Sequence, residues 1–155
     1  MLGRGRTEAR EAAEPQFIHS IYILSKSGGL IYQKDFTKAA SKLNTNDHLR
    51  LGGLFYSFNS IAKDLSPVMD CQGIEVLETE TFKLHCFQTL TGTKFLMVAD
   101  PKHSQMAKVL EQVYELYSDY VLKNPFYEFE QPIRCEKFDT FMNELMRAKN
   151  TPEKK

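Results

Sequence analysis

The sequence of 155 residues has no tryptophan, no surplus of either charge and only three cysteines. Twenty basic and 20 acidic side chains give a formal net charge of +0. A dedicated nucleic-acid binder needs clustered, surplus Lys and Arg, so this balance argues against nucleic acid as a partner. The length suits one domain, and a hydrophobic share of 42% is enough to form a folded core.

Long apolar runs are absent as well. The longest lie at residues 21–24 and 95–99, whereas a spanning helix needs about 20 apolar residues, so we expect no direct membrane span. Residues 1–16 alternate arginines with glutamates and lack the apolar stretch of a secretory signal. We interpret 1–16 as a flexible polar tail, 17–150 as a single domain and 151–155 as a frayed C-terminus.

Motifs for chemistry are missing too. Cys71, Cys86 and Cys135 are scattered without a Cys-x-x-Cys pair, which argues against a zinc or redox site and favours reduced thiols in a cytosolic protein. His85 and Cys86 are adjacent on an expected strand, so their side chains point to opposite faces and cannot form a catalytic dyad. No phosphate-loop spacing occurs. We therefore expect no catalytic residue, no metal and no cofactor, and a protein that is not an enzyme.

Hydrophobic periodicity predicts five strands. Residues 17–25 and 30–32 flank Ser27-Gly28-Gly29, which is typical of a β-hairpin. The first run is apolar at both parities, which predicts a central strand covered on both faces. Further strands are expected at 74–80, 82–90 and 94–99, and their tight spacing indicates an antiparallel meander.

Three helices complete the pattern. The first is expected to be capped at Asn46-Asp47 and to end at Ser66-Pro67. The second is expected to follow a turn or cap that begins at Asp100-Pro101, and to stop at Asn124-Pro125. The third has an apolar stripe beginning at Phe138. The order β-β-α-β-β-β-α-α predicts an α+β fold of three layers (α/β/α), with a five-stranded antiparallel sheet, the first helix on one face and the last two on the other.

Two surfaces are candidates for binding a partner. The first helix places Leu51, Leu54, Phe55 and Phe58 on one face. Gly52-Gly53 in the same helix costs roughly 0.8–1 kcal/mol per glycine relative to Ala, which is tolerable where another chain segment approaches closely. That segment is either the protein's own sheet or a partner.

The second candidate surface is a proline-bounded loop. It contains Tyr127, Phe129, Ile133 and Arg134, and aromatic residues with Arg are typical of interface hot spots. The alternative is that these aromatic side chains fill the gap between two helices. Both interpretations can hold for different residues.

Four stretches of the sequence resemble one known family. They are Lys-Ser-Gly-Gly-Leu-Ile-Tyr-Gln at 26–33, the run at 73–95 that includes Thr-Phe-Lys-Leu-His-Cys-Phe, Leu-Tyr-Ser-Asp-Tyr-Val-Leu at 116–122 with its continuation to 127, and Pro-Ile-Arg-Cys at 132–135. These stretches closely resemble the synbindin family, small core subunits of the TRAPP vesicle-tethering complex, over residues 17–146. Animal members carry a PDZ-like insertion where this chain has only the connector 37–46.

The resemblance implies a longin-like (SNARE-like) fold and heteromeric assembly with other small TRAPP core subunits. It also implies a peripheral location at the endoplasmic reticulum and Golgi, and a part in ER-to-Golgi and Golgi transport. The assembled core would promote nucleotide exchange on a Rab-family GTPase, while this chain binds no nucleotide. From composition and position, we assign the first-helix residues to subunit pairing and the loop residues to a GTPase-facing or partner surface.

An alternative is a longin-like adaptor or SNARE-type module that acts outside TRAPP. A longin SNARE would continue into a heptad-repeat helix and a membrane anchor, and this sequence contains neither. An enzyme would require a convergent polar cleft with perturbed side chains.

Overall fold

The computed structural model describes residues 17–37, 44–69, 71 and 73–150. The tail at 1–16, the end at 151–155 and most of the connector at 37–46 lie outside these ranges. The elements follow in the order β1 (Ile18–Leu24), β2 (Leu30–Asp35), α2 (Thr45–Leu65), β3 (Val76–Glu78), β4 (Lys83–Gln88), β5 (Lys94–Ala99), α3 (Met106–Tyr117), the π-helical η2 (Ser118–Leu122) and α4 (Glu136–Asn150). This order and the α+β class confirm the prediction.

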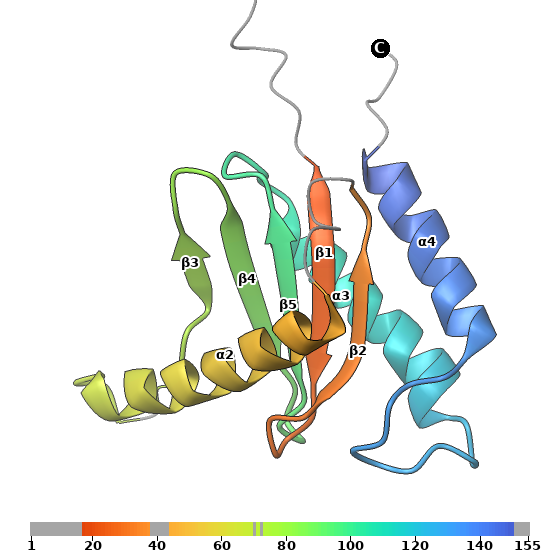
Figure 1. The fold of residues 1–155 in the computed structure, drawn as a ribbon, viewed down its shortest axis with the longest axis horizontal. Coiled ribbons are helices and arrows are strands. Elements are labelled where there is room, and N and C mark those ends of the chain that lie inside the picture. The colour runs from red at the N-terminus through yellow and green to blue at the C-terminus, as the bar shows by residue number, and fades with distance from the viewer. Residues whose placement is uncertain (1–16, 38–43, 70, 72, 151–155) are drawn as a thin grey trace, which may run out of the picture.

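The sheet has five antiparallel strands in the order β2-β1-β5-β4-β3. β1 lies inside the sheet, and Ile21, Ile23 and Leu24 are fully buried, so the prediction of a strand covered on both faces is confirmed. α2 crosses one face, while α3 and α4 lie on the other (Figure 1). The three-layer arrangement expected from the sequence is therefore present.

The β1–β2 turn follows the glycine prediction. Gly28 has φ +93, a backbone conformation that residues with a Cβ rarely adopt. The Gly28 N–H donates to the Ser25 carbonyl at 2.9 Å, and the Ser25 N–H donates to the Gly29 carbonyl at 2.8 Å. The glycines therefore serve a tight hairpin turn.

The start of α2 was predicted two residues too late. Asn44, and not Asn46-Asp47, is the N-cap: its side-chain oxygen accepts from the Asp47 N–H at 2.9 Å, while the Asp47 carboxylate accepts from the Asn44 N–H at 3.4 Å. This is a capping box, in which the acid belongs at the third helical position. The end was predicted correctly, since Ser66 is the C-cap.

The second helix follows a turn at Asp100-Pro101, which is one of the two interpretations that the sequence left open. α3 starts at Met106, and Asp100-Pro101 belongs to the preceding turn. Asp100 is not the cap, since the N-cap of α3 is Gln105; the Asp100 carboxylate accepts hydrogen bonds from the Phe17 N–H at 2.7 Å and from His19 at 2.8 Å. The helical path continues through η2 and ends before Asn124-Pro125.

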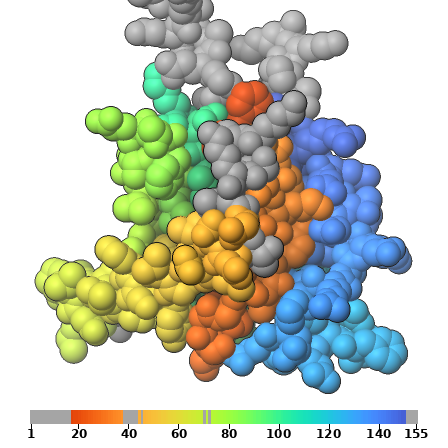
Figure 2. Space-filling view, viewed as in Figure 1, coloured from red at the N-terminus to blue at the C-terminus, as the bar shows by residue number. Residues whose placement is uncertain are grey.

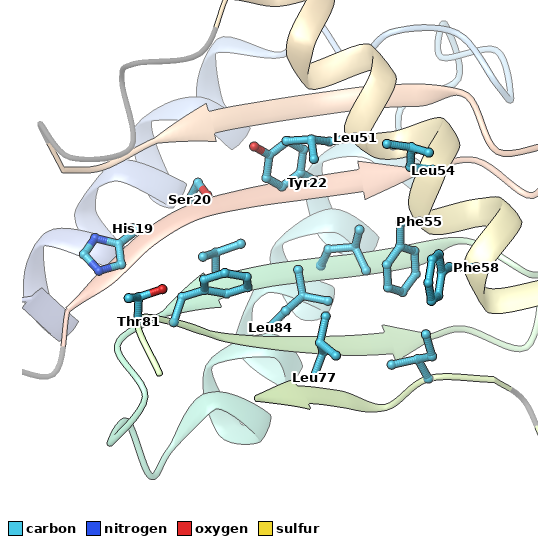
Figure 3. Close-up of a pocket in the computed structure, with 15 residues that line it drawn as sticks. His19, Ser20, Tyr22, Leu51, Leu54, Phe55, Phe58, Leu77, Thr81 and Leu84 are labelled. Atoms are coloured by element: carbon cyan, nitrogen blue, oxygen red, sulfur yellow. The ribbon is translucent and has the colours of Figure 1, made fainter. Parts of the chain in front are cut away.

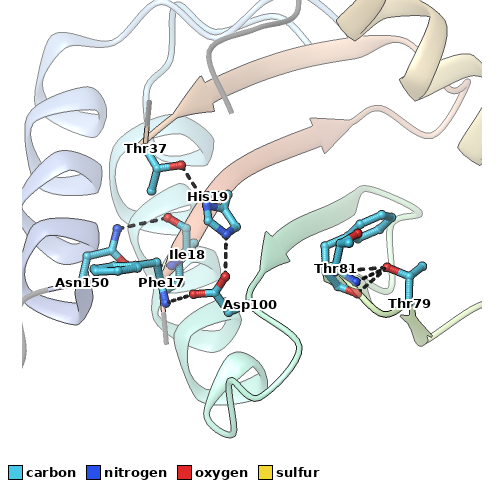
Figure 4. Close-up of polar contacts among 9 residues, drawn as sticks. Phe17, Ile18, His19, Thr37, Thr79, Thr81, Asp100 and Asn150 are labelled. Atoms are coloured by element: carbon cyan, nitrogen blue, oxygen red, sulfur yellow. Dashed lines mark hydrogen bonds and ion pairs between the residues drawn. The ribbon is translucent and has the colours of Figure 1, made fainter. Parts of the chain in front are cut away.

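The main core lies between the sheet and the pair α3 and α4. Phe95 and Met97 of β5 are fully buried there, as are Phe138, Met142 and Met146 of α4. The Asn150 side chain closes this layer by accepting from the Ile18 N–H at 2.7 Å and donating to the Ile18 carbonyl at 3.0 Å (Figure 4). The end of α4 is thus joined to the start of β1.

The α2 side has a smaller core. Tyr22, Leu24, Cys86 and Leu96 form it, with Phe55 packed against them. Figure 2 shows α2 lying across the front of the molecule, with its C-terminal end projecting beyond the strands. One helix therefore covers this face only in part.

Candidate functional site

An apolar groove lies between α2 and the sheet, and we call it the α2 groove. Its volume is about 720 Å³, and its lining side chains come from α2 and from β1, β3, β4 and β5 and point toward one another (Figure 3). All four residues predicted for subunit pairing belong to it. Its lining is Leu51, Gly52, Leu54, Phe55 and Phe58 of α2, with His19, Ser20, Tyr22, Ile74, Leu77, Thr81, Phe82, Leu84, Leu96 and Val98.

The stripe on α2 lines the groove without filling it. Leu54 and Phe58 remain 63% and 65% exposed, whereas Phe55 is half-buried and reaches the small core. Residues three and four positions apart lie on the same side of a helix, so the stripe follows directly from the sequence spacing. Such exposure of large apolar side chains on one face is typical of a surface that another protein covers.

Close contacts fix α2 against the end of β1. A Cβ on Gly52 would lie 3.0 Å from Leu24 Cδ2, whereas a Cβ on Gly53 would meet nothing within 4 Å. Of the two interpretations of this glycine pair, close packing on the protein's own sheet holds for Gly52. Gly53 faces open space, so this packing does not explain it.

Polar contacts hold the same helix. His48 Nδ1 shares a hydrogen bond of 2.9 Å with the Tyr22 hydroxyl, and His48 Nε2 lies 3.6 Å from the Asp35 carboxylate. Further along α2, the ammonium of the buried Lys94 lies 5.2 Å from the centre of the Tyr56 ring, and burial lowers the pKa of Lys94. The position of the groove's helical wall is therefore fixed at both its N-terminal end and its middle.

The sheet wall of the groove was missed from the sequence. Leu77 and Leu84 are paired across β3 and β4, and Leu84 is paired with Val98 of β5, so the three side chains form a row on one face. The alternation at 74–80 and 82–90 was the available signal. It was read as strands, but periodicity alone does not show which face a helix leaves uncovered. The regular strand β3 is also shorter than predicted, at three residues.

The proline-bounded loop that contains Tyr127, Phe129, Ile133 and Arg134 has both buried and exposed residues. Ile133 is buried in the main core, and its N–H donates to the Ile31 carbonyl at 2.8 Å. Tyr127 is half-buried, its hydroxyl donates to the Gln131 carbonyl at 2.9 Å, and burial raises its pKa to about 12. Phe129 is 74% exposed, and Arg134 is exposed.

A second cavity of about 300 Å³ lies under this loop, against Tyr120 and Val121. The structure therefore places Ile133 and Tyr127 as supports of the loop, which matches the gap-filling interpretation. Phe129 and Arg134, together with the exposed Phe126, form its outward surface. Phe126 was not among the predicted residues, although it stands in the same aromatic run.

A polar cluster surrounds His19, one of the residues that line the α2 groove (Figure 4). His19 Nδ1 is 2.8 Å from the Thr37 hydroxyl, and His19 Nε2 is 2.8 Å from Asp100 Oδ1. The second Asp100 oxygen accepts from the Phe17 N–H. The cluster thus joins the start of β1, the segment after β2 and the end of β5, and it holds these strand ends together.

His85 and Cys86 lie on opposite faces of β4, as the strand alternation predicts. Burial raises the pKa of the Cys86 thiol to about 11, so the thiolate is scarce at neutral pH. Within the described residues, no group of three or more His, Cys, Asp or Glu side chains could hold a metal ion, and no helix has the length and apolar character needed to cross a membrane.

Comparison with known proteins identifies one family and relatives within it. The family model described as the Sybindin-like family matches residues 18–149. "Trafficking protein particle complex subunit 4" of Dictyostelium discoideum is 58% identical over 130 residues, which are 83% of this chain and 96% of that protein. Subunit 4 of Bos taurus is 54% identical over 98 residues, 63% of this chain and 45% of the bovine protein, so the match spans about half of that relative.

A further relative and a solved structure are less similar to this chain. "Trafficking protein particle complex subunit 1" of Dictyostelium discoideum is 34% identical over 132 residues, which are 83% of this chain and 91% of that protein. Among solved structures, the one described as "MglB with tetrameric arrangement" has a TM-score of 0.46 at 14% identity, over 96% of this chain and 95% of its own. The likeness to solved structures is too distant to inform function.

Proposed function

This chain belongs to the Sybindin-like family, and we propose that it is a non-enzymatic core subunit of a TRAPP-type tethering complex. In this role it assembles with other small subunits and contributes to a core that promotes nucleotide exchange on a Rab-family GTPase in ER-to-Golgi and Golgi transport. The observation that supports assembly most directly is the α2 groove, where Leu51, Leu54 and Phe58 stay exposed.

The energetic reason is the loss of exposed apolar surface. Each square ångström of apolar surface removed from water contributes about 25 cal/mol, and the groove presents several large side chains on a wall that is already fixed. A sister subunit that covers the groove therefore gains hydrophobic free energy without first reorganising this chain. The isolated chain is expected to associate with itself or with other proteins for the same reason.

The part played in nucleotide exchange requires no reaction on this chain. A surface that binds the nucleotide-free form of a GTPase more tightly than the nucleotide-bound form shifts the equilibrium toward nucleotide release. Phe126, Phe129 and Arg134 supply the exposed aromatic and cationic side chains for such a surface on the loop. Tyr127 and Ile133 support that loop from beneath.

The test combines assembly with nucleotide release. We expect the tagged wild-type chain to co-purify with small TRAPP subunits and to accelerate release of labelled GDP from a Rab GTPase in the assembled core. The double variant Leu54→Asp/Phe58→Asp should lose co-purification, because it places two charges in the groove. Leu90→Asp is the matched control, since Leu90 is fully exposed in the β4–β5 turn, away from the groove.

The loop is tested separately. Phe129→Ala/Arg134→Ala should keep assembly and slow nucleotide release, since both side chains are exposed. If the wild-type chain neither assembles with these subunits nor affects release, the proposed function is wrong. If the groove variant assembles as well as Leu90→Asp, the groove is not the pairing surface.

A further inference from the structure

Four side chains form a second polar cluster, which we call the Lys94 cluster: Tyr56 and Lys63 of α2, Gln88 of β4 and Lys94 of β5. Tyr56 and Lys63 are seven positions apart, so they lie on the same side of the helix. None of the four residues lines the α2 groove. A Cβ on Gly28 would lie 2.7 Å from Cγ of Tyr56, so the cluster lies at the end of the sheet that has the β1–β2 turn (Figure 1).

Lys94 lies on the sheet beneath this side of α2. It is only 4% exposed, and it is paired directly with Leu24 of β1 and with Gln88 of β4. Side chains of directly paired residues point to the same face of a sheet, and Leu24 belongs to the small core under α2. Lys94 and Gln88 therefore both extend toward α2, where the Lys94 ammonium lies 5.2 Å from the centre of the Tyr56 ring.

The positive charge of Lys94 has no counter-charge within the described part of the chain. No carboxylate there forms an ion pair with Lys94 or with Lys63. Burial lowers the pKa of Lys94, and the nearby charge of Lys63 lowers it further. Cys86 of β4 would act in the opposite direction as a thiolate, but its own pKa of about 11 keeps it protonated at neutral pH. A buried ammonium without an anionic partner costs folding free energy, and the contact with the Tyr56 ring offsets part of that cost.

The neighbouring Gln88 side chain is also incompletely satisfied. Its Oε1 atom is buried, and no described residue donates a hydrogen bond to it. Buried polar atoms in folded proteins almost always have a partner. A half-turn of the amide brings its N–H donors to the same position. Lys94 and Gln88 are thus adjacent side chains whose polar ends lack partners among the described residues.

The ligand that fits this cluster is a carboxylate. One of its oxygens can accept from the Lys94 ammonium while the other accepts from Lys63 or from the Gln88 amide. Because Lys94 is buried and Lys63 is exposed, the ligand has to extend inward from the surface, as an Asp or Glu side chain does. A phosphate in the plane of a membrane surface would meet Lys63 and not Lys94.

We propose that Lys94, Lys63 and the Gln88 amide form a binding site for one carboxylate, supplied by an Asp or Glu side chain of a neighbouring subunit. This inference rests on the proposed function, because the ligand belongs to another subunit of the same complex. It does not require the α2 groove to be the pairing surface. The incoming charge compensates the two ammonium groups, so the cost that the isolated chain carries becomes affinity in the complex.

The variant Lys94→Met separates binding from folding. Methionine keeps the apolar stem and can contact the Tyr56 ring through its sulfur, whereas the charge is lost. The isolated variant should unfold at the same temperature as the wild type or at a higher one, because it no longer buries an unpaired ammonium. Its affinity for the small TRAPP subunits should fall about tenfold, as expected for the loss of one charged hydrogen bond.

Two further variants complete the set. Lys63→Met replaces an exposed side chain, so it should fold normally and weaken assembly by a smaller factor than Lys94→Met. The matched control is Lys108→Met, which removes an exposed charge from α3 on the opposite side of the sheet. It should change neither the unfolding temperature nor assembly.

Carbodiimide coupling identifies the source of the carboxylate. The reagent joins an amine to a carboxylate when the two groups are in contact. In the assembled complex it should link Lys63 or Lys94 to an Asp or Glu of a neighbouring subunit, and mass spectrometry should detect the joined peptides. Replacing the two lysines should remove this link.

Each result bears on one proposal or on both. Normal assembly of Lys94→Met would overturn the carboxylate site and leave the proposed function standing. If Lys94→Met unfolds well below the wild type and Lys63→Met assembles normally, Lys94 serves the fold and the site is wrong. If Lys94→Met loses binding only to phosphatidylserine vesicles, the ligand is a lipid and the site is wrong as proposed. Failure of the wild-type chain to assemble with any small subunit would overturn both proposals.

Discussion

The two faces of the sheet differ in how far the chain covers them. On the side of α3 and α4, Phe95, Met97 and Phe138 have no exposed surface. On the α2 side, a single helix buries Leu24 and leaves Leu54 and Phe58 largely in solvent. Both faces are apolar in sequence, so hydrophobicity alone does not distinguish a core from a binding surface. The number of helices available to each face makes the difference.

The largest expected effect tests the closed face. Phe138→Ala should reduce the free energy of unfolding by about 3–5 kcal/mol, since it removes a fully buried ring and leaves a cavity. Phe58→Ala is the matched change on the open face and should cost less than about 1 kcal/mol in the isolated chain. Urea unfolding of both variants measures the contrast. Equal losses of unfolding free energy in the two variants would mean that the chain covers the two faces to the same extent.

An effect of intermediate size is expected at Cys86, which belongs to the small core on the α2 side of the sheet. Burial raises its folded pKa from 9.0 to about 11, so between these pH values the unfolded chain has released a proton that the folded chain retains. Rising pH therefore favours unfolding, by up to about 2 kcal/mol. Below pH 9 the thiol is protonated in both the folded and the unfolded chain, so this loss of stability does not occur there.

The measurement is the free energy of unfolding against pH for the wild type and Cys86→Ala. The wild type should lose more stability than the variant between pH 9 and 11. Comparing the two slopes isolates this thiol from the tyrosines and lysines that titrate nearby. Identical slopes would show that α2 does not shield Cys86 from water.

The smallest effect locates where α2 touches the sheet. Gly53→Ala should stabilise the chain by about 1 kcal/mol, because a Cβ there meets nothing within 4 Å and alanine favours the helix. Gly52→Ala should gain less, because its Cβ would press on Leu24 at 3.0 Å and Leu24 is fully buried. Thermal unfolding of the two variants compares them directly. An equal gain at both positions would place α2 farther from β1 than the structure does.

Much of this fold follows from local pattern. Short apolar runs and alternation predicted the strands, three- and four-residue spacing predicted the helices, and Ser27-Gly28-Gly29 predicted the first turn, as the structure confirms. The error at the start of α2 occurs where two asparagines stand close together. Asn44 caps α2 in place of Asn46.

The candidate site was predictable only on its helical side. Leu51, Leu54, Phe55 and Phe58 share a stripe that the sequence spacing reveals, and the structure brings them into one groove. The opposite wall depends on the register of β3, β4 and β5, which is set by contacts between distant segments. The burial of Ile133 likewise depends on its bond to Ile31, far away in the chain.

The bracket that Asn150 forms on both backbone groups of Ile18 has a mechanical consequence. It brings the first strand and the last helix together at the end of the molecule opposite the β1–β2 turn (Figure 1). Tension applied through sequences attached at both termini would act first on this pair of bonds and on β1. β3, which is separated from β1 by β5 and β4, would bear little of that load.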